Sequence, residues 1–189
     1  MEERLNILNS SNKKVLLHAC CAICSSYPIS YLKDMGYDVV VYFYNPNIYP
    51  NDEYERRLEA QKLLCTHFGC KLIVGRYEPE IFESFVEGLE KEPEKGLRCD
   101  RCFELRLVAA AQKAKELNIE LFTTSIVISP HKDYEKLTAI GSDIASKNGL
   151  KYLGINFRKN DGFLKSNRIS RALNLYRQNY CGCKYAILK

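Results

Sequence analysis

Short apolar runs alternate with longer amphipathic stretches along the chain. The apolar runs are too short for helices and end at polar or turn residues, so they predict buried strands. They lie at 15–19, 39–44, 72–74, 120–129 and 151–157. The stretches between them predict helices that stop near Gly or Asn. These helices are expected at 29–35, 53–68, 102–117 and 134–147.

This alternation of strand and helix predicts an α/β fold. It indicates a five-stranded, parallel, Rossmann-like sheet with helices on both faces. A chain of 189 residues suits one such domain, residues 1–189. Two segments depart from the pattern: an acidic insertion at 78–98 that leads to a Cys motif, and a basic C-terminal segment at 156–189. In parallel sheets the active site lies beyond the carboxyl ends of the strands.

The distribution of charge singles out the C-terminal segment. Residues 156–189 contain eight Lys and Arg against one Asp, which gives this segment a charge of +7. Residues 1–155 carry −2, and the net charge of the chain is +5. Basic side chains interleaved with aromatic ones suit single-stranded or looped RNA. A solvated amphipathic helix is the alternative interpretation.

The apolar runs and the amino terminus favour the cytoplasm as the compartment. No run approaches the ~20 residues that a membrane-spanning helix needs. The charged and polar stretch at 1–14 lacks the pattern of a signal peptide.

Seven of the nine cysteines fall into three groups, Cys20/Cys21/Cys24, Cys99/Cys102 and Cys181/Cys183. In a reducing compartment such groups indicate a metal or redox site rather than structural disulfides. The first two groups supply five sulfurs, more than one tetrahedral zinc or one cubane cluster needs. The adjacent Cys-Cys pair favours a cluster, and a zinc site that pins two loops is the alternative.

Other residues near these groups have candidate roles. Asp100 is a candidate second-metal ligand, or it complements the positive start of a helix. The Gly between Cys181 and Cys183 allows a strained, labile disulfide suited to a redox relay, with metal ligation or burial as alternatives. His131 and Lys132 follow the fourth strand and are candidates for substrate contact. We expect Asp133 to cap the next helix, and Cys65 and Cys70 to be packing residues.

Six motifs together carry a family resemblance. They read LHACCAICS at 17–25, YNPNI at 44–48, RCDRC at 98–102, SPHK at 129–132, FRK at 157–159 and YCGC at 180–183. With these motifs the chain resembles the cobalamin-independent epoxyqueuosine reductases, the QueH family, over about residues 14–186. One departure is Ile23, which stands where the family pattern has Pro and affects the shape of a turn rather than ligation.

The resemblance implies a fold, an activity and a set of cofactors. The fold is a sheet like that of the adenine nucleotide alpha hydrolases (HUP-type), and the activity is reduction of epoxyqueuosine in the tRNA anticodon loop to queuosine, the last step of queuosine biosynthesis. A [4Fe-4S] cluster maps by motif onto Cys20, Cys21, Cys99 and Cys102, and a redox-active disulfide onto Cys181 and Cys183. A neighbouring iron is associated with the family, and Cys24 and Asp100 are the ligands that remain for it.

The hypothesis for the reaction is a two-electron deoxygenation. The second iron would act as a Lewis acid on the epoxide oxygen, and an external donor would supply electrons through the Cys181/Cys183 dithiol and the cluster. Asp100, His131 or a nearby Tyr would supply protons. The residues expected to contact the substrate are His131, Lys132, Arg158, Lys165, Arg168 and Arg171.

Two other classes of protein remain as alternatives. A zinc-stabilised, non-enzymatic RNA-binding domain would need no Cys-Gly-Cys pair. Another thiol-dependent tRNA-modifying enzyme would share the sheet, but should carry a Ser/Gly-rich phosphate loop after the first strand, which this chain lacks.

Overall fold

The structure is a computed structural model and describes residues 13–187. Most of the polar amino-terminal stretch lies outside these residues, as do residues 188–189 of the basic segment. In chain order the elements are β1 (Lys14–His18), α2 (Ala22–Asp34), β2 (Asp38–Phe43), α3 (Asn51–Phe68), β3 (Lys71–Val74), α4 (Pro79–Phe85), α5 (Leu97–Glu116), β4 (Leu121–Thr124), the 3-10 turn η1 (Ser125–Ile128), α6 (Tyr134–Asn148), β5 (Lys151–Tyr152), α7 (Gly162–Ala172) and the 3-10 turn η2 (Lys184–Ala186).

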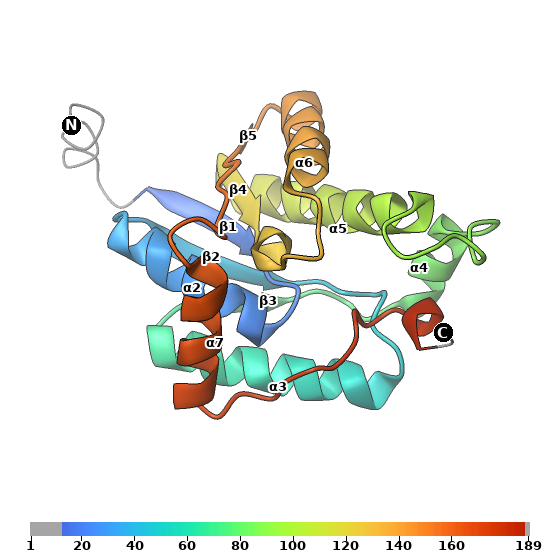
Figure 1. The fold of residues 1–189 in the computed structure, drawn as a ribbon. Coiled ribbons are helices and arrows are strands. Elements are labelled where there is room, and N and C mark those ends of the chain that lie inside the picture. Colours follow the sequence, from blue (N-terminus) through green and yellow to red (C-terminus); the bar gives the residue numbers. More distant parts are fainter. Residues whose placement is uncertain (1–12, 188–189) are drawn as a thin grey trace.

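The five strands form one parallel sheet in the order β3-β2-β1-β4-β5 (Figure 1). In the central strand, Leu16 pairs with Val40 on one side and with Phe122 on the other. Residues 15–18 are completely buried, as expected for a strand covered on both faces. The predicted parallel five-stranded sheet is therefore confirmed.

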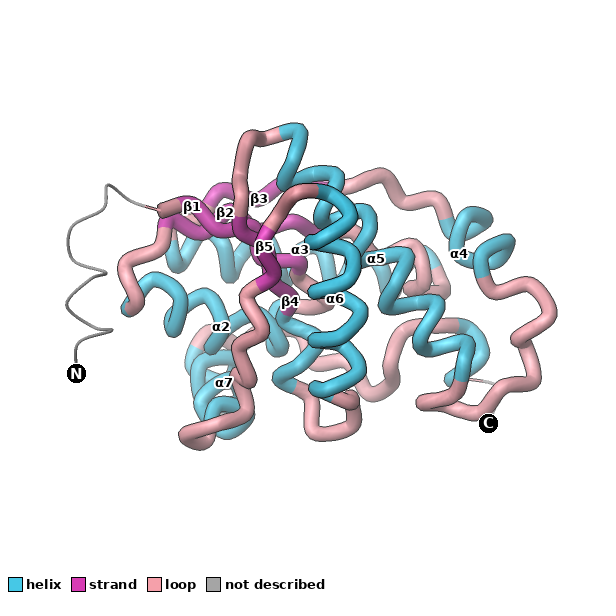
Figure 2. Tube along the Cα trace, turned by 90° about the horizontal axis from the view of Figure 1, so that it is seen from above, coloured by secondary structure: helices cyan, strands magenta, loops and turns pink. Residues whose placement is uncertain are grey.

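Helices cover both faces of this sheet. Helices α2 and α3 contact β2 on one face, whereas α5 contacts β1 and β4 on the other and α6 contacts α5 and β5. Helix α7 packs on α2 (Figure 2). From α7 the chain runs along α3 towards the end of α4, so the C-terminal segment crosses the molecule (Figure 1).

Several predicted boundaries shift in the structure. The helix expected at 29–35 begins at Ala22, because Cys21 acts as its N-cap and its Sγ accepts a hydrogen bond from the Cys24 backbone N–H at 3.5 Å. The strand expected at 120–129 ends at Thr124, where the hydroxyl accepts from the Ile126 N–H at 3.2 Å and the chain turns into η1. The strand expected at 151–157 is two residues long.

Other local signals behave as predicted. Gly69 and Gly149 end α3 and α6 in the left-handed conformation, and the Asp133 carboxylate caps α6 by accepting from the Lys136 N–H at 3.1 Å. The acidic insertion at 78–98, for which no helix is predicted from the sequence, contains a short helix, α4. Pro79 is its first residue, a favoured position for Pro.

Small residues let α7 approach α2 closely. The Ser26 hydroxyl donates to the Ser166 carbonyl at 3.2 Å, and the Ser166 hydroxyl accepts from the Tyr27 N–H at 3.3 Å. At the start of α7, a Cβ on Gly162 would lie 1.7 Å from the Phe157 carbonyl oxygen. The basic segment, for which a solvated amphipathic helix is the alternative to an RNA-binding role, thus forms a helix, α7, with one face docked on α2. Arg168 and Arg171 of this helix remain exposed.

Within residues 13–187, no helix combines the length and the apolar character that crossing a membrane requires.

We predict that Gly162→Ala destabilises the protein more than Gly36→Ala does. A Cβ at Gly162 collides with backbone, which should lower the free energy of unfolding by ~3 kcal/mol or more. A Cβ at Gly36 meets open space, so only its φ of +82° is penalised, at about 1–2 kcal/mol. Urea denaturation of both variants measures the difference. Equal losses of unfolding free energy would contradict the close contact between the start of α7 and the Phe157 backbone.

Candidate metal and redox site

A pocket of about 550 Å³ opens at the carboxyl ends of the central strands. Strands β1 and β4 are neighbours in the sheet, but the chain leaves β1 into α2 on one face and reaches β4 from α5 on the other. This reversal creates a crevice, the usual position of a binding site in such a sheet. The volume lies within the ~300–1,000 Å³ typical of small-molecule sites.

Three cysteine thiols gather at one wall of this pocket. Cys20 and Cys21 follow β1 and Cys24 lies in the first turn of α2, and their sulfur atoms all lie within 4.8 Å of one another. All three residues line the pocket. Because thiolates are soft ligands, this group can hold a metal ion.

Hydrogen bonds make the three thiols unequal. Those from the Cys21 and Cys24 thiols hold the pKa of Cys20 well below its usual value, and the Ser125 hydroxyl, 3.4 Å from the Cys20 sulfur, adds to this effect. Their own hydrogen bonds to Cys20 raise the pKa of Cys21 to about 12 and also raise that of Cys24. One deprotonated sulfur is therefore stabilised by two neighbouring thiols.

Arg106 places a buried positive charge beside the thiols. Its side chain lines the pocket although the residue is 5% exposed, and its Nε donates to the Cys102 carbonyl at 3.1 Å. Burial lowers its pKa, but the charges of Cys102 and Cys20 outweigh this and raise it. The guanidinium thus offsets negative charge on the Cys20 thiolate.

The second cysteine group lies at the start of α5. The Cys99 sulfur accepts from the Lys95 N–H at 3.3 Å, and burial raises the pKa of Cys102 to about 12. One Asp100 oxygen accepts from the Lys136 ammonium at 3.0 Å, and the other is buried without a partner. These three α5 residues are not among those that line the pocket, so their joint ligation with the first group stays a prediction.

The two cysteines of the Cys-Gly-Cys motif occupy different surroundings. Cys181 lines the pocket, and its sulfur accepts from the Lys132 ammonium at 3.3 Å. Cys183 is 8% exposed and packs with Phe82 and Cys102, and burial raises the pKa of its thiol. Both thiols are free in the structure.

The predicted substrate contacts divide into two sets. His131 and Lys132 line the pocket, as does Arg177, which was not among the predicted contacts. The others lie outside it: Arg158 donates to the Lys132 carbonyl at 3.4 Å, the Lys165 ammonium lies over the Tyr27 ring, and Arg168 and Arg171 are exposed on α7.

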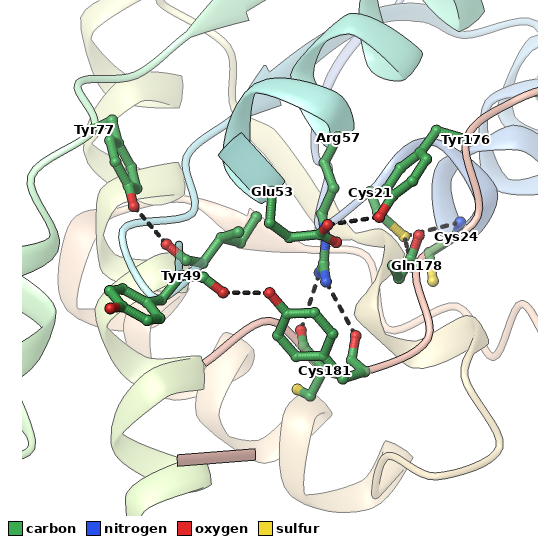
Figure 3. Close-up of polar contacts among 11 residues, drawn as sticks. Cys21, Cys24, Tyr49, Glu53, Arg57, Tyr77, Tyr176, Gln178 and Cys181 are labelled. Carbon is green, nitrogen blue, oxygen red and sulfur yellow. Dashed lines mark hydrogen bonds and ion pairs between the residues drawn. The ribbon is translucent and has the colours of Figure 1, made fainter. Parts of the chain in front are cut away.

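Sequence reasoning missed several polar residues that build the site. The Gln178 amide donates to the Cys21 sulfur at 2.7 Å, and the Arg57 guanidinium donates to the carbonyls of Tyr180 and Cys181 at 3.1 Å each (Figure 3). Arg106 is the third. A usable signal existed for both arginines, because each is a charged residue on the buried face of a long helix.

His18 is a structural residue that lies completely buried in the core. Its Nε2 lies 3.0 Å from the Tyr44 carbonyl and its Nδ1 lies 3.0 Å from the Thr124 hydroxyl. Burial lowers its pKa to about 4. The neutral ring therefore ties together the ends of β1, β2 and β4 behind the thiols.

A sequence profile described as "Epoxyqueuosine reductase QueH" matches residues 15–189. The chain belongs to the QueH family. A QueH protein from Streptococcus pyogenes serotype M1 is 40% identical over 183 residues, which cover 94% of this chain and 71% of that relative. A QueH protein from Helicobacter pylori is 42% identical over 183 residues, which cover 92% of this chain and 49% of the relative. The predicted family and its enzyme class, an oxidoreductase, are confirmed.

Solved structures similar to this QueH chain confirm the expected fold. A U34-tRNA thiolase, NcsA from Methanococcus maripaludis, described with its [4Fe-4S] cluster, matches with a TM-score of 0.60 and 13% identity over 98% of this chain and 67% of that one. An NH3-dependent NAD synthetase from Campylobacter jejuni matches with a TM-score of 0.52 and 14% identity over 92% and 69%. The sheet is thus of the adenine nucleotide alpha hydrolase-like type.

We predict that the Cys20/Cys21/Cys24 group of this QueH chain binds a soft divalent metal. Titration of the anaerobic metal-free protein with Co²⁺ should give thiolate-to-metal absorption. Cys24→Ser should weaken binding by more than the ~10–100-fold that loss of an outer partner costs. Cys65→Ser, at a buried thiol of α3, is the control and should bind as wild type does. Equal affinity in all three proteins would contradict the site.

Proposed function

We propose that this protein reduces epoxyqueuosine to queuosine within tRNA. The reaction takes up two electrons and two protons, breaks both C–O bonds of the epoxide and releases the oxygen as water. The observation that carries this proposal is that the Cys20/Cys21/Cys24 group and Cys181 line the same pocket. This pocket lies at the crevice between β1 and β4, and its volume of about 550 Å³ suits a nucleoside. Family membership supports the substrate and the reaction.

The proposed cofactor is a [4Fe-4S] cluster held by Cys20, Cys21, Cys99 and Cys102, with a neighbouring iron on Cys24 and Asp100. Bound there, the cluster would supply electrons singly and the iron would polarise a C–O bond. The chain's own residues suit such a group in two ways. The sulfurs are soft donors, and buried Arg106 compensates their negative charge. The unpartnered Asp100 oxygen is a free hard donor of the kind that iron also accepts.

The remaining chemistry falls to residues around Cys181. We assign Cys181 and Cys183 the role of a dithiol that gives up two electrons and two protons as their S–S bond forms. An external donor would then reduce the disulfide. The Lys132 ammonium donates a hydrogen bond to the Cys181 sulfur at 3.3 Å. Of the proton donors considered from the sequence, His131 is an exposed ring on the pocket wall, whereas Asp100 is paired with Lys136.

The basic segment would bring tRNA to the pocket. Its exposed Arg168 and Arg171 suit phosphate contacts, and Arg177 reaches the pocket wall. A single modified nucleoside turned out of the anticodon loop would then enter the pocket.

We propose that residues 1–189 act as one domain in which the insertion at 78–98 supplies Cys99 and residues 156–189 bind RNA. A cytoplasmic location fits this substrate and the free thiols.

The activity is tested by incubating anaerobically purified protein with epoxyqueuosine-containing tRNA and a chemical reductant. Nucleoside mass analysis should show the loss of one oxygen from the modified base. Cys181→Ser should abolish turnover and keep the visible absorption of the cluster, because this residue is assigned to the relay and not to ligation. Unchanged nucleoside mass with fully loaded protein would contradict the function, and loss of absorption in the variant would make Cys181 a ligand.

Binding of tRNA through α7 is tested separately. Arg168→Ala and Arg171→Ala should each weaken tRNA binding and reduce the slope of log K against log salt by about 1. Lys147→Ala, an exposed cation on α6 paired with Asp143, is the control. Equal salt slopes for wild type and both arginine variants would move the RNA surface away from α7.

A further inference from the structure

A buried ion pair on α3 lies against the part of the chain that carries Cys181. Arg57 Nε donates to Glu53 Oε1 at 2.7 Å, and the two side chains are 3% and 6% exposed. Both residues stand on the buried face of α3, four positions apart. Charges buried to this extent are costly unless every donor and acceptor has a partner. The partners come from residues 176–183, named here the C-terminal strap.

The Arg57 guanidinium contacts two consecutive carbonyls of the strap. Its Nη1 donates to the Cys181 carbonyl and its Nη2 to the Tyr180 carbonyl, each at 3.1 Å (Figure 3). The planar guanidinium presents these two donors at a fixed spacing, and a lysine ammonium at the same place would not. The strap is thus held at two adjacent backbone positions by one rigid group.

Glu53 orients that group and is itself tied to the strap. Its second oxygen, Oε2, accepts from the Tyr176 hydroxyl at 2.6 Å. The carboxylate therefore connects the guanidinium to the beginning of the strap, while the guanidinium connects to its end.

Gly182 shows how closely the strap approaches the guanidinium. A Cβ at this residue would lie 2.8 Å from Arg57 Nη1, and the backbone has a φ of +115° that favours glycine. The Gly182 carbonyl also accepts from the Tyr49 N–H at 2.8 Å. The residue between the two cysteines is therefore fixed from both sides.

We propose that Arg57, oriented by Glu53, is a positioning residue for Cys181. By fixing residues 180–182, it turns the Cys181 sulfur towards the pocket and Lys132, and leaves the Cys183 sulfur in the buried cluster with Phe82. The consequence for chemistry rests on the proposed relay role of Cys181. The consequence for geometry does not, because it concerns which of the two sulfurs faces the pocket.

The test compares Arg57→Lys and Glu53→Gln with Glu59→Gln. Glu59 makes an exposed ion pair with Lys62 on the same helix, so its variant controls for loss of a helical ion pair. Arg57→Lys keeps the charge but loses the two-pronged donor. Tyr176→Phe, which removes one hydroxyl from the network, serves if either buried variant fails to fold.

The first measurement is the relative alkylation rate of Cys181 and Cys183 in the anaerobically purified, reduced protein, resolved by peptide mass spectrometry. In the wild type and in Glu59→Gln, Cys181 should react faster because it lines the pocket. In Arg57→Lys and Glu53→Gln, or in Tyr176→Phe where it replaces one of them, we expect the ratio to change ~3-fold or more. The kcat should fall by ~10–100-fold with little change in the KM for tRNA, as expected for a misplaced reacting group.

The outcomes separate positioning from simple stabilisation. The proposal would be overturned if Arg57→Lys unfolded at a lower temperature but had the same alkylation ratio and the same kcat as the control variant Glu59→Gln. Normal turnover by Cys181→Ser would overturn the relay function, but the alkylation ratio would still test the placement of the sulfur. A changed ratio together with a reduced kcat in Arg57→Lys supports the proposal.

Discussion

The change in the face of the sheet that the connecting helices cover, between the parallel neighbours β1 and β4, is the constraint on which the rest of the site depends. Because the two strands are hydrogen-bonded neighbours whose helices cover opposite faces, a crevice is expected beyond their carboxyl ends. The residue pair that follows β1, Cys20 and Cys21, must therefore enter this crevice. In dinucleotide-binding sheets of this class the loop after the first strand is rich in glycine. In this chain the corresponding loop contains Cys20 and Cys21.

A second constraint is electrostatic, because the crevice gathers groups that are costly to bury. A thiolate at Cys20 is stabilised by two neighbouring thiols and by Arg106 from the opposite face of the sheet. Elsewhere in the pocket, the Lys132 ammonium donates to the Cys181 sulfur. Arg57, paired with Glu53, donates to the backbone carbonyl of the same cysteine. Cations thus accompany each reactive sulfur group, which fits a site that handles electrons and an anionic polymer.

Much of the fold could be predicted from the sequence because its signals are local. Apolar runs marked the strands, and Gly69 and Gly149 marked helix ends. The apolar run at 120–129 predicts one strand, because burial alone does not distinguish a strand from the 3-10 turn that Thr124 starts. The contacts of Arg57 with the Cys181 and Tyr180 carbonyls could not be predicted, because these groups lie 124 and 123 positions away along the chain. The cysteine motifs identified the site, but long-range packing decided which sulfurs share it.

We propose that the cysteine-lined crevice is a redox centre and not a zinc site that joins two loops. An assay of iron and acid-labile sulfide in anaerobically purified protein distinguishes the two. We expect bound iron together with sulfide, both lost in Cys20→Ser and both retained in Cys65→Ser. One tightly bound zinc per chain with no sulfide would contradict it.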